Sequence, residues 1–277
     1  MLASVRGKPT IAVLGHTGML GGYITTHFKK EEYDVALANP FDAATATTEE
    51  LRELVSGLRG PAVVINCIGI IKQREGVTDE QFMAVNAEFP HRLQEATAAA
   101  GARLIHISTD CVFSGKHGLY TERHTPDPVD EYSRSKLSGE PAGATVVRTS
   151  CIGSERKQKL SLLEWVKAQA GKEANGYTNH FWNGVTCLQL AVFLEQIVAQ
   201  GALWEGVRHY YSPQDVSKYE LVRMMSDAYG LRVAVQPVEA PAAINRTLRS
   251  VQPLAVPPGL EEQLRKLHEF DTLSGLC

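Results

Sequence analysis

Short apolar segments alternate with amphipathic ones through the first 150 residues. The apolar segments have the length and composition of strands that are buried on both faces of a sheet, and they are 10–14, 34–38, 61–66, 103–108 and 144–149. The amphipathic segments predict helices over 19–30, 48–57, 81–100 (kinked or restarted at Pro90) and 132–139. Strands that alternate with helices are joined by right-handed crossovers. The pattern therefore predicts an α/β fold with a doubly wound parallel sheet.

The pattern changes after residue 149, where apolar strands become rarer and prolines more frequent. Helices are predicted over 161–170, 185–200 and 217–229, and strands over 207–211 and 232–238. We expect two domains: an α/β domain at 1–150 and a smaller lobe at 151–277. The boundary is soft, because the second region can return strands to the main sheet.

Composition narrows the class of partner. The net charge of −3 provides no overall basic field for nucleic acid or an anionic membrane, so neither is an expected partner. The first ten residues have no apolar core of a signal peptide, and the apolar runs have the length of strands, so the protein is expected in the cytoplasm. The five cysteines form no CxxC pair and the histidines no HExxH motif, so free thiols and no metal site are expected.

A glycine-rich turn joins the first predicted strand to the first helix. Its glycines, at positions 15, 18 and 21, lie three residues apart in the run Gly15-His16-Thr17-Gly18-Met19-Leu20-Gly21. Such a turn needs glycine to bend tightly, to let the backbone approach a diphosphate, and to let the helix pack closely on the strand. The first N–H groups of the helix then face the phosphates. The turn predicts a Rossmann-type dinucleotide site, with a ligand-free strand–helix turn as the alternative.

The expected cofactor is NADPH, with NADH as the other candidate. An acidic residue at the end of the second strand would favour NAD, but Ala38-Asn39-Pro40 holds no carboxylate to repel a 2′-phosphate. The cofactor contacts that we expect outside the catalytic pair described next are Gly15, Thr17, Gly18, Met19, Leu20, Gly21, Asn39, Asn66, Cys67 and Ile68. For Asn66, a plain turn residue is an equally good reading.

The strongest chemical signal is a tyrosine and a lysine four residues apart. Tyr132 and Lys136 share one face of a predicted helix, and an ammonium beside a phenol is expected to lower the pKa of the phenol. The tyrosine can then exchange a proton with a substrate oxygen, while the lysine also holds the ribose of the cofactor. Thr109, or Ser108, follows the fourth strand, at the sheet edge where ligands bind in such folds, and can hold the carbonyl. The alternative is a solvated helix pair.

These motifs resemble a known family. The runs Ser108-Thr109-Asp110-Cys111-Val112-Phe113-Ser114-Gly115 and Tyr132-x-x-x-Lys136-Leu137-x-Gly139-Glu140 are similar to those of dTDP-4-dehydrorhamnose reductase and its relatives, which are extended short-chain dehydrogenase/reductases. Val64–Cys67, Val85–Glu88 and Val147–Ser150 match in the same order. The likeness covers about residues 10–150 and becomes thinner beyond them.

The resemblance implies a Thr109-Tyr132-Lys136 set that reduces the 4-keto group of a 6-deoxy sugar on a nucleoside diphosphate. It places Phe113, Cys151, His180, Trp182, Asn183 and Arg246, with Cys111, around the substrate. The alternative for Trp182 is simple packing, and the alternative for Arg246 is a position on the surface. Lys157 and Lys159 are expected on a solvated face. By analogy with relatives, a homodimer is expected.

Two other functions stay open. The family typically has tyrosine where Cys111 stands and often has tryptophan where Cys151 stands, so the reaction type transfers better than the sugar. Similar enzymes epimerise C3 and C5 before reduction, and a Cys111 thiolate could remove the proton while His180 returns it. The alternative for Cys111 is a small residue that lines the pocket. The second function is a non-catalytic NAD(P)-binding regulatory subunit, which would have no need of the intact Thr109, Tyr132 and Lys136.

Overall fold

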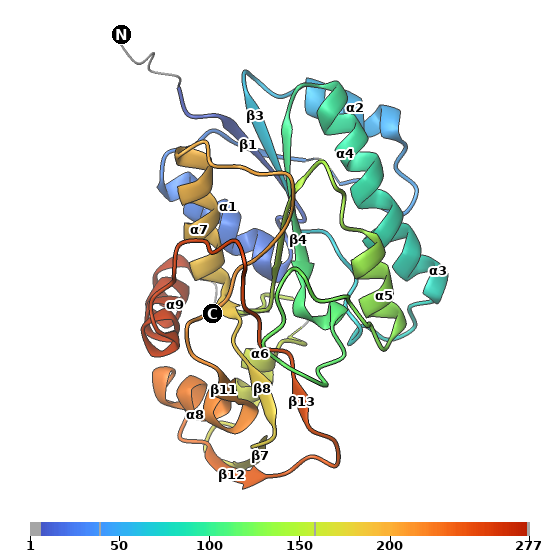
Figure 1. Ribbon diagram of the computed structural model, residues 1–277. Helices are drawn as coiled ribbons and strands as arrows, with labels where there is room; N and C mark the ends of the chain where they lie inside the picture. The colour runs from blue at the N-terminus through green and yellow to red at the C-terminus, as the bar shows by residue number, and fades with distance from the viewer. Residues whose placement is uncertain (1–6, 39, 158, 276–277) are drawn as a thin grey trace.

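A six-stranded parallel sheet forms the centre of the molecule (Figure 1). The computed structural model describes residues 7–38, 40–157 and 159–275. The strand order is β10-β5-β4-β3-β1-β2, and every pairing is parallel. The strands are β1 (Thr10–Leu14), β2 (Val35–Leu37), β3 (Ala62–Asn66), β4 (Arg103–Thr109), β5 (Thr145–Thr149) and β10 (Gly206–His209). The predicted doubly wound α/β class is confirmed.

Helices cover both faces of this sheet. On one face, α1 (Met19–Lys30) packs against α7 (Cys187–Ala199), and on the other α2 (Thr48–Ser56) packs against α4 (Phe89–Ala99). Alternate residues of β1 point to the two faces: Ile11 and Val13 join the core under α1 and α7, while Ala12 and Leu14 join the core under α2 and α4. This burial on both sides explains why the strands read as continuous apolar runs.

A helix of irregular winding leads into α4. α3 (Asp79–Phe82) passes into a π-helical segment, η1 (Met83–Glu88), and α4 begins at Phe89 with Pro90 in its first turn. The predicted interruption near Pro90 is therefore confirmed, and it extends through the six preceding residues. Proline fits the first turn of a helix, because its missing N–H has no intrahelical partner there.

The second region contributes a strand to the main sheet and builds smaller sheets beside it. β10 pairs with β5, while the short strands lie at the carboxyl end of the sheet. These strands are β6 (Cys151–Ile152), β7 (Glu173–Tyr177), β8 (His180–Trp182), β9 (Val185–Thr186), β11 (Val216–Ser217), β12 (Ala234–Val238) and β13 (Ile244–Asn245). The helices are α6 (Leu162–Ala168), α8 (Lys218–Ala228) and α9 (Leu260–Ser274).

The sequence interpretation missed α9 and most of the short strands. Leu260, Leu264 and Leu267 form its buried face, which packs with α7 and α8. Their spacing of four and three residues is a helical signal, but the prolines before it suggested loop. Among the described residues, no helix is both long and apolar enough to cross a membrane.

Candidate active site

The glycine-rich turn is built for close backbone packing. Gly15 adopts φ +81°, a conformation that favours glycine, and a Cβ on Gly21 would lie 2.2 Å from the carbonyl oxygen of Gly15. Any side chain at position 21 would therefore clash with the turn, which is why α1 can pack this closely only with glycine there. Gly18 is the N-cap of α1. It has no side chain that could cap the helix, so no side chain accepts a hydrogen bond from the first N–H groups of α1.

Two cavities share the lining residues Ile68–Ile70 and Arg74, and one of them adjoins this turn. One of about 400 Å³, here called the turn cavity, is lined by Gly15, Thr17, Gly18, Met19 and the segment 67–71. A second, of about 810 Å³, lies between Pro40–Ala44 and Ile68–Ile70. Uncapped N–H groups beside an open cavity suit a diphosphate, and the larger cavity suits an adenosine, so these residues fit a dinucleotide. Asn39 lies outside the described residues.

The predicted catalytic residues share a third cavity, here called the Tyr132 cavity. It has a volume of about 310 Å³, and Thr109, Tyr132 and Lys136 line it together. Tyr132 and Lys136 project from α5 (Glu131–Ser138), which begins where the Asp130 side chain accepts a hydrogen bond from the Ser133 N–H. Met19, Leu20, Cys67 and Ile68 line the same cavity, which joins it to the glycine-rich turn.

Lys136 is buried with most of its hydrogen-bonding capacity unused. Its Nζ donates to the carbonyl oxygen of Ile107 at 2.9 Å, and only 6% of the residue is exposed. Burial lowers the pKa of the Lys136 ammonium to about 8, although the charge of Glu140 acts in the opposite direction. An ammonium has three N–H donors, so two remain for ligand hydroxyls.

The expected lowering of the Tyr132 pKa is wrong. Burial raises the pKa of Tyr132 above its usual value, the neighbouring Cys111 raises it further, and the Thr109 hydroxyl acts to lower it. The Lys136 ammonium donates instead to the carbonyl oxygen of Ile107. Tyr132 is therefore protonated at neutral pH, which is the form that a proton donor needs.

A buried ion pair supports the end of α5. Glu140 accepts two hydrogen bonds from Arg148 of β5, at 2.8 and 2.6 Å, and a third from the Ser108 hydroxyl of β4. The two charged side chains are 6% and 7% exposed. Ser108 and Thr109 both line the Tyr132 cavity, but the Ser108 hydroxyl is already used on the ion pair.

Two asparagines hold the loop that follows β3. Asn66 accepts from the Ile68 N–H, and its amide lies 3.1 Å from His106 Nδ1, so it turns the chain and does not line the cavities, unlike Cys67 and Ile68. Asn86 of η1 bonds both backbone groups of Ile70 and also the Ser135 hydroxyl of α5. Asn86 thereby joins this loop to the helix that carries Tyr132.

Cys111 lines the Tyr132 cavity beside a buried carboxyl group. Its pKa rises to about 11, because burial and the Asp110 carboxyl both disfavour the thiolate. Asp110 is 5% exposed, and burial raises its pKa against the opposing charges of Arg246 and Lys218. These directions favour Cys111 as a lining residue over a base.

Of the residues predicted around the substrate, Cys111 and Cys151 line the Tyr132 cavity, whereas Phe113 and Asn183 do not. Phe113 is fully buried and stacks on Tyr120, with ring centroids 4.3 Å apart. The side-chain amide of Asn183 donates to the carbonyl oxygen of Leu248 and accepts a hydrogen bond from its N–H. The sequence interpretation placed Phe113 and Asn183 against the substrate; the structure places them in the core.

The other substrate-side predictions fall in the second region. Trp182 is 4% exposed, and the Lys218 ammonium lies 5.3 Å from its ring centroid. His180 Nε2 bonds the Ala242 carbonyl oxygen at 3.0 Å and does not line the Tyr132 cavity. Arg246 donates from Nε to the Phe113 carbonyl oxygen at 2.9 Å. The packing alternative describes Trp182 better than direct substrate contact.

The sequence interpretation overlooked two lysines near the cavity. Lys72 lines it, and its Nζ lies 3.9 Å from Asp130. Lys218 starts α8, where its charge acts on Asp110 and Cys111. Lys72 could have been found from its place shortly after β3, at the carboxyl edge of the sheet. Lys218 has no such local signal, because only the fold brings the start of α8 to this point.

Fold and site together define an extended short-chain dehydrogenase/reductase, with a glycine-rich Rossmann turn and a Tyr-x-x-x-Lys pair in one continuous set of cavities. The particular family follows from comparison: the sequence model of the RmlD substrate binding domain family matches residues 9–254, and the chain belongs to that family.

Three similar proteins illustrate the range of relatives. The methionine adenosyltransferase 2 subunit beta of Danio rerio is 28% identical over 80% of this chain and 74% of its own length. The dTDP-4-dehydrorhamnose reductase of Mycobacterium tuberculosis is 34% identical over 58% of this chain and 57% of its own length. The crystal structure of the dTDP-4-dehydrorhamnose reductase of Bacillus anthracis in complex with NADP superposes with a TM-score of 0.80 at 21% identity, and the match covers 94% of this chain and 99% of that one.

Proposed function

We propose that the protein is an NAD(P)H-dependent reductase of the 4-keto group of a nucleoside-diphosphate 6-deoxy sugar, with NADPH as the preferred cofactor. The observation that carries the proposal is the convergence of Thr109, Tyr132 and Lys136 on one cavity that continues to the glycine-rich turn. The relatives named as dTDP-4-dehydrorhamnose reductases support the substrate class.

Each residue of this set has a distinct part in the proposed reaction. The nicotinamide, when bound, supplies hydride to the keto carbon. Tyr132 donates its phenolic proton to the keto oxygen, and the raised pKa of the phenol keeps this proton available. Thr109 directs its hydroxyl to the same oxygen, and the two donors stabilise the developing negative charge. Lys136 holds the ribose hydroxyls with the two N–H groups that Ile107 leaves unused.

Cationic side chains from both regions of the chain supply positive charge for the sugar nucleotide. Lys72, Lys218 and Arg246 come from three separate segments and all act on the Cys111 thiol or the Asp110 carboxyl at the cavity. Three cations near one cavity suit a diphosphate. We keep the division into a cofactor domain at 1–150 and a substrate lobe at 151–277, a cytoplasmic location, the absence of a nucleic-acid partner and a homodimer as parts of the proposal.

One measurement tests the reductase directly. Oxidation of NADPH and NADH is followed at 340 nm against a panel of 4-keto-6-deoxy sugars on dTDP, UDP, GDP and CDP, in deuterated water, with products analysed by mass. We expect turnover with no deuterium bound to carbon. Deuterium retained at C3 or C5 would instead assign the epimerase/reductase, which the raised pKa of Cys111 disfavours.

A regulatory subunit is the second candidate function. It is favoured by the similarity over four-fifths of the chain to methionine adenosyltransferase 2 subunit beta. The arrangement of Thr109, Tyr132 and Lys136 around one cavity argues for chemistry at this site. Tight cofactor binding without oxidation by any sugar of the panel would favour the regulatory candidate.

A further inference from the structure

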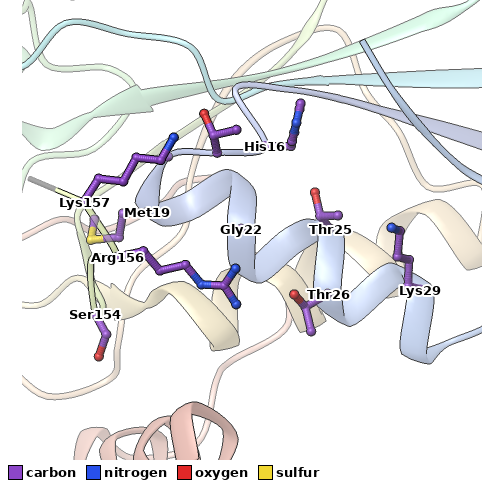
Figure 2. Close-up of a pocket in the computed structure, with 11 residues that line it drawn as sticks. His16, Met19, Gly22, Thr25, Thr26, Lys29, Ser154, Arg156 and Lys157 are labelled. Carbon is purple, nitrogen blue, oxygen red and sulfur yellow. The ribbon is translucent and has the colours of Figure 1, made fainter. Parts of the chain in front are cut away.

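Two loops, one from each region of the chain, place cationic side chains at the turn cavity. Arg74, in the loop after β3, lines both the turn cavity and the larger cavity beside Pro40–Ala44. Arg156 and Lys157, in the loop after β6, line the turn cavity from the other region of the chain. Figure 2 shows Lys157 extending toward the turn that leads into α1, while Arg156 lies alongside that helix near Gly22.

These cations are available to a ligand. Within the described ranges, no carboxylate lies within salt-bridge distance of Arg74, Arg156 or Lys157. The acidic residue that lines the turn cavity, Glu155, uses its carboxylate to accept the Leu160 N–H at 2.6 Å. The charge that faces the cavity is therefore mainly positive, beside a helix end that is itself partly positive.

The loop that carries Lys157 is fixed at its base. The Ser154 hydroxyl donates to Asp271 of α9 and accepts from Lys167, and the Ser154 N–H donates to the Tyr23 hydroxyl of α1. Asp271 is fully buried and also accepts from Tyr23 and Tyr229. The residues just after Ser154 are therefore held beside α1 by a network that reaches the last helix.

From this geometry we infer that Arg74 and Lys157 hold the diphosphate of the dinucleotide cofactor from two sides, with Arg156 reinforcing Lys157. The inference rests on the proposed function, since it requires a dinucleotide at the glycine-rich turn. It assigns a ligand to Lys157, which the sequence places on a solvated face and which is exposed in the structure. Charge-assisted hydrogen bonds to phosphate are directional and shorter than neutral ones, so both side chains contribute to cofactor affinity.

Binding measurements on the intact protein test the clamp. The variants are Arg74→Gln and Lys157→Gln. The matched control is Lys159→Gln, which neutralises an exposed lysine two residues from Lys157 that lines neither the turn cavity nor the neighbouring cavity along α1. Dissociation constants are measured by calorimetry for NADPH, NADH, ADP-ribose and adenosine 2′-monophosphate. All three positions are exposed, so folding is not at risk.

We expect each test variant to raise the dissociation constants of NADPH, NADH and ADP-ribose by about tenfold. The dissociation constant of adenosine 2′-monophosphate, and all constants of the control variant, should stay unchanged. A loss confined to NADPH and adenosine 2′-monophosphate would overturn the inference, because it would assign these residues to the 2′-phosphate. Equal affinity in all variants, or a wild type that binds no dinucleotide, would overturn it as well. Binding as expected without turnover would leave the clamp standing and reject the reductase instead.

Discussion

Glu140 and Arg148 form a bidentate ion pair that is buried between the end of α5 and the central sheet. Removing one charge of such a pair leaves the other buried without compensation, which costs about 3–5 kcal/mol. We therefore expect Glu140→Gln to lower the free energy of unfolding by about 3 kcal/mol, measured by urea denaturation. The control is Glu262→Gln, which breaks an exposed pair with Lys266 and should cost less than about 1 kcal/mol. Equal effects of the two variants would contradict the structural role of Glu140.

The phenol of Tyr132 is the proposed proton donor. Tyr132→Phe removes only the hydroxyl and leaves the ring beside Phe82, so the fold and the cofactor site should survive. We expect turnover to fall by about 10²–10⁴-fold, the range of a lost general acid, while the dissociation constant of NADPH stays within a factor of about two. Tyr177→Phe, at an exposed tyrosine, is the control. Unimpaired turnover of Tyr132→Phe would remove Tyr132 from this role.

The pH dependence of the reaction should report Lys136. Its pKa in the free protein is lowered to about 8, so the ammonium that holds the ribose is lost as the pH rises through 8. We expect kcat/KM, which reports groups of the free enzyme, to be constant below about pH 7 and to decline tenfold per pH unit well above 8. A profile that stays flat to pH 10 would contradict the burial of this ammonium.

The free energy of unfolding should change with pH in the opposite direction from kcat/KM. The pKa of a lysine in the unfolded chain is near 10.5, so between about pH 8 and 10.5 the unfolded state binds more protons at residue 136 than the folded state. The contribution of Lys136 to the free energy of unfolding therefore increases with pH across this window. Comparison of urea denaturation at pH 7.5 and 9.5 in wild type and Lys136→Met isolates this contribution, which the variant should lack.

The sequence predicted the residues of the proposed catalytic centre better than the residues around it. Gly15–Gly21 and Tyr132 with Lys136 were recognisable, because these functions require particular residue types at short, fixed spacings. Lys218 was not, since its proximity to Asp110 arises only when the start of α8 packs near the end of β4. Phe113 was misplaced for a related reason: it neighbours Cys111 in the chain but points into a core with Tyr120.

The direction of the Tyr132 pKa shows a further limit of spacing. Two residues four apart share a helix face, but the Lys136 ammonium donates to the carbonyl oxygen of Ile107. Burial then determines the pKa of both groups. A helical pattern specifies which side chains are neighbours, whereas the depth of the helix in the fold specifies their charge state.

Asp271 should affect cofactor binding through Ser154, although it lies in the last helix. Asp271→Ala leaves the hydroxyls of Tyr23, Tyr229 and Ser154 without their shared acceptor. We expect a loss of about 3 kcal/mol in the free energy of unfolding and a several-fold weaker affinity for NADPH, because the loop that carries Lys157 is released. The control is Leu267→Ala, which opens a cavity of similar cost in the same helix without touching Ser154. Equal cofactor affinity in the two variants would mean that Asp271 acts on stability alone.

Cys111 distinguishes a plain reductase from an epimerase/reductase. With its pKa raised to about 11, less than one thousandth of the thiol is ionised at pH 7.5, so a base at this position would be poorly populated. We expect wild-type product formed in deuterated water to carry no deuterium at C3 or C5, and Cys111→Ser to reduce turnover far less than Tyr132→Phe, since serine keeps the small polar wall of the cavity. Mass analysis of the product gives both readouts. Deuterium at C3 or C5 that disappears in Cys111→Ser would make the thiol a base, and its effective pKa in the presence of the sugar would then have to lie well below that of the free protein.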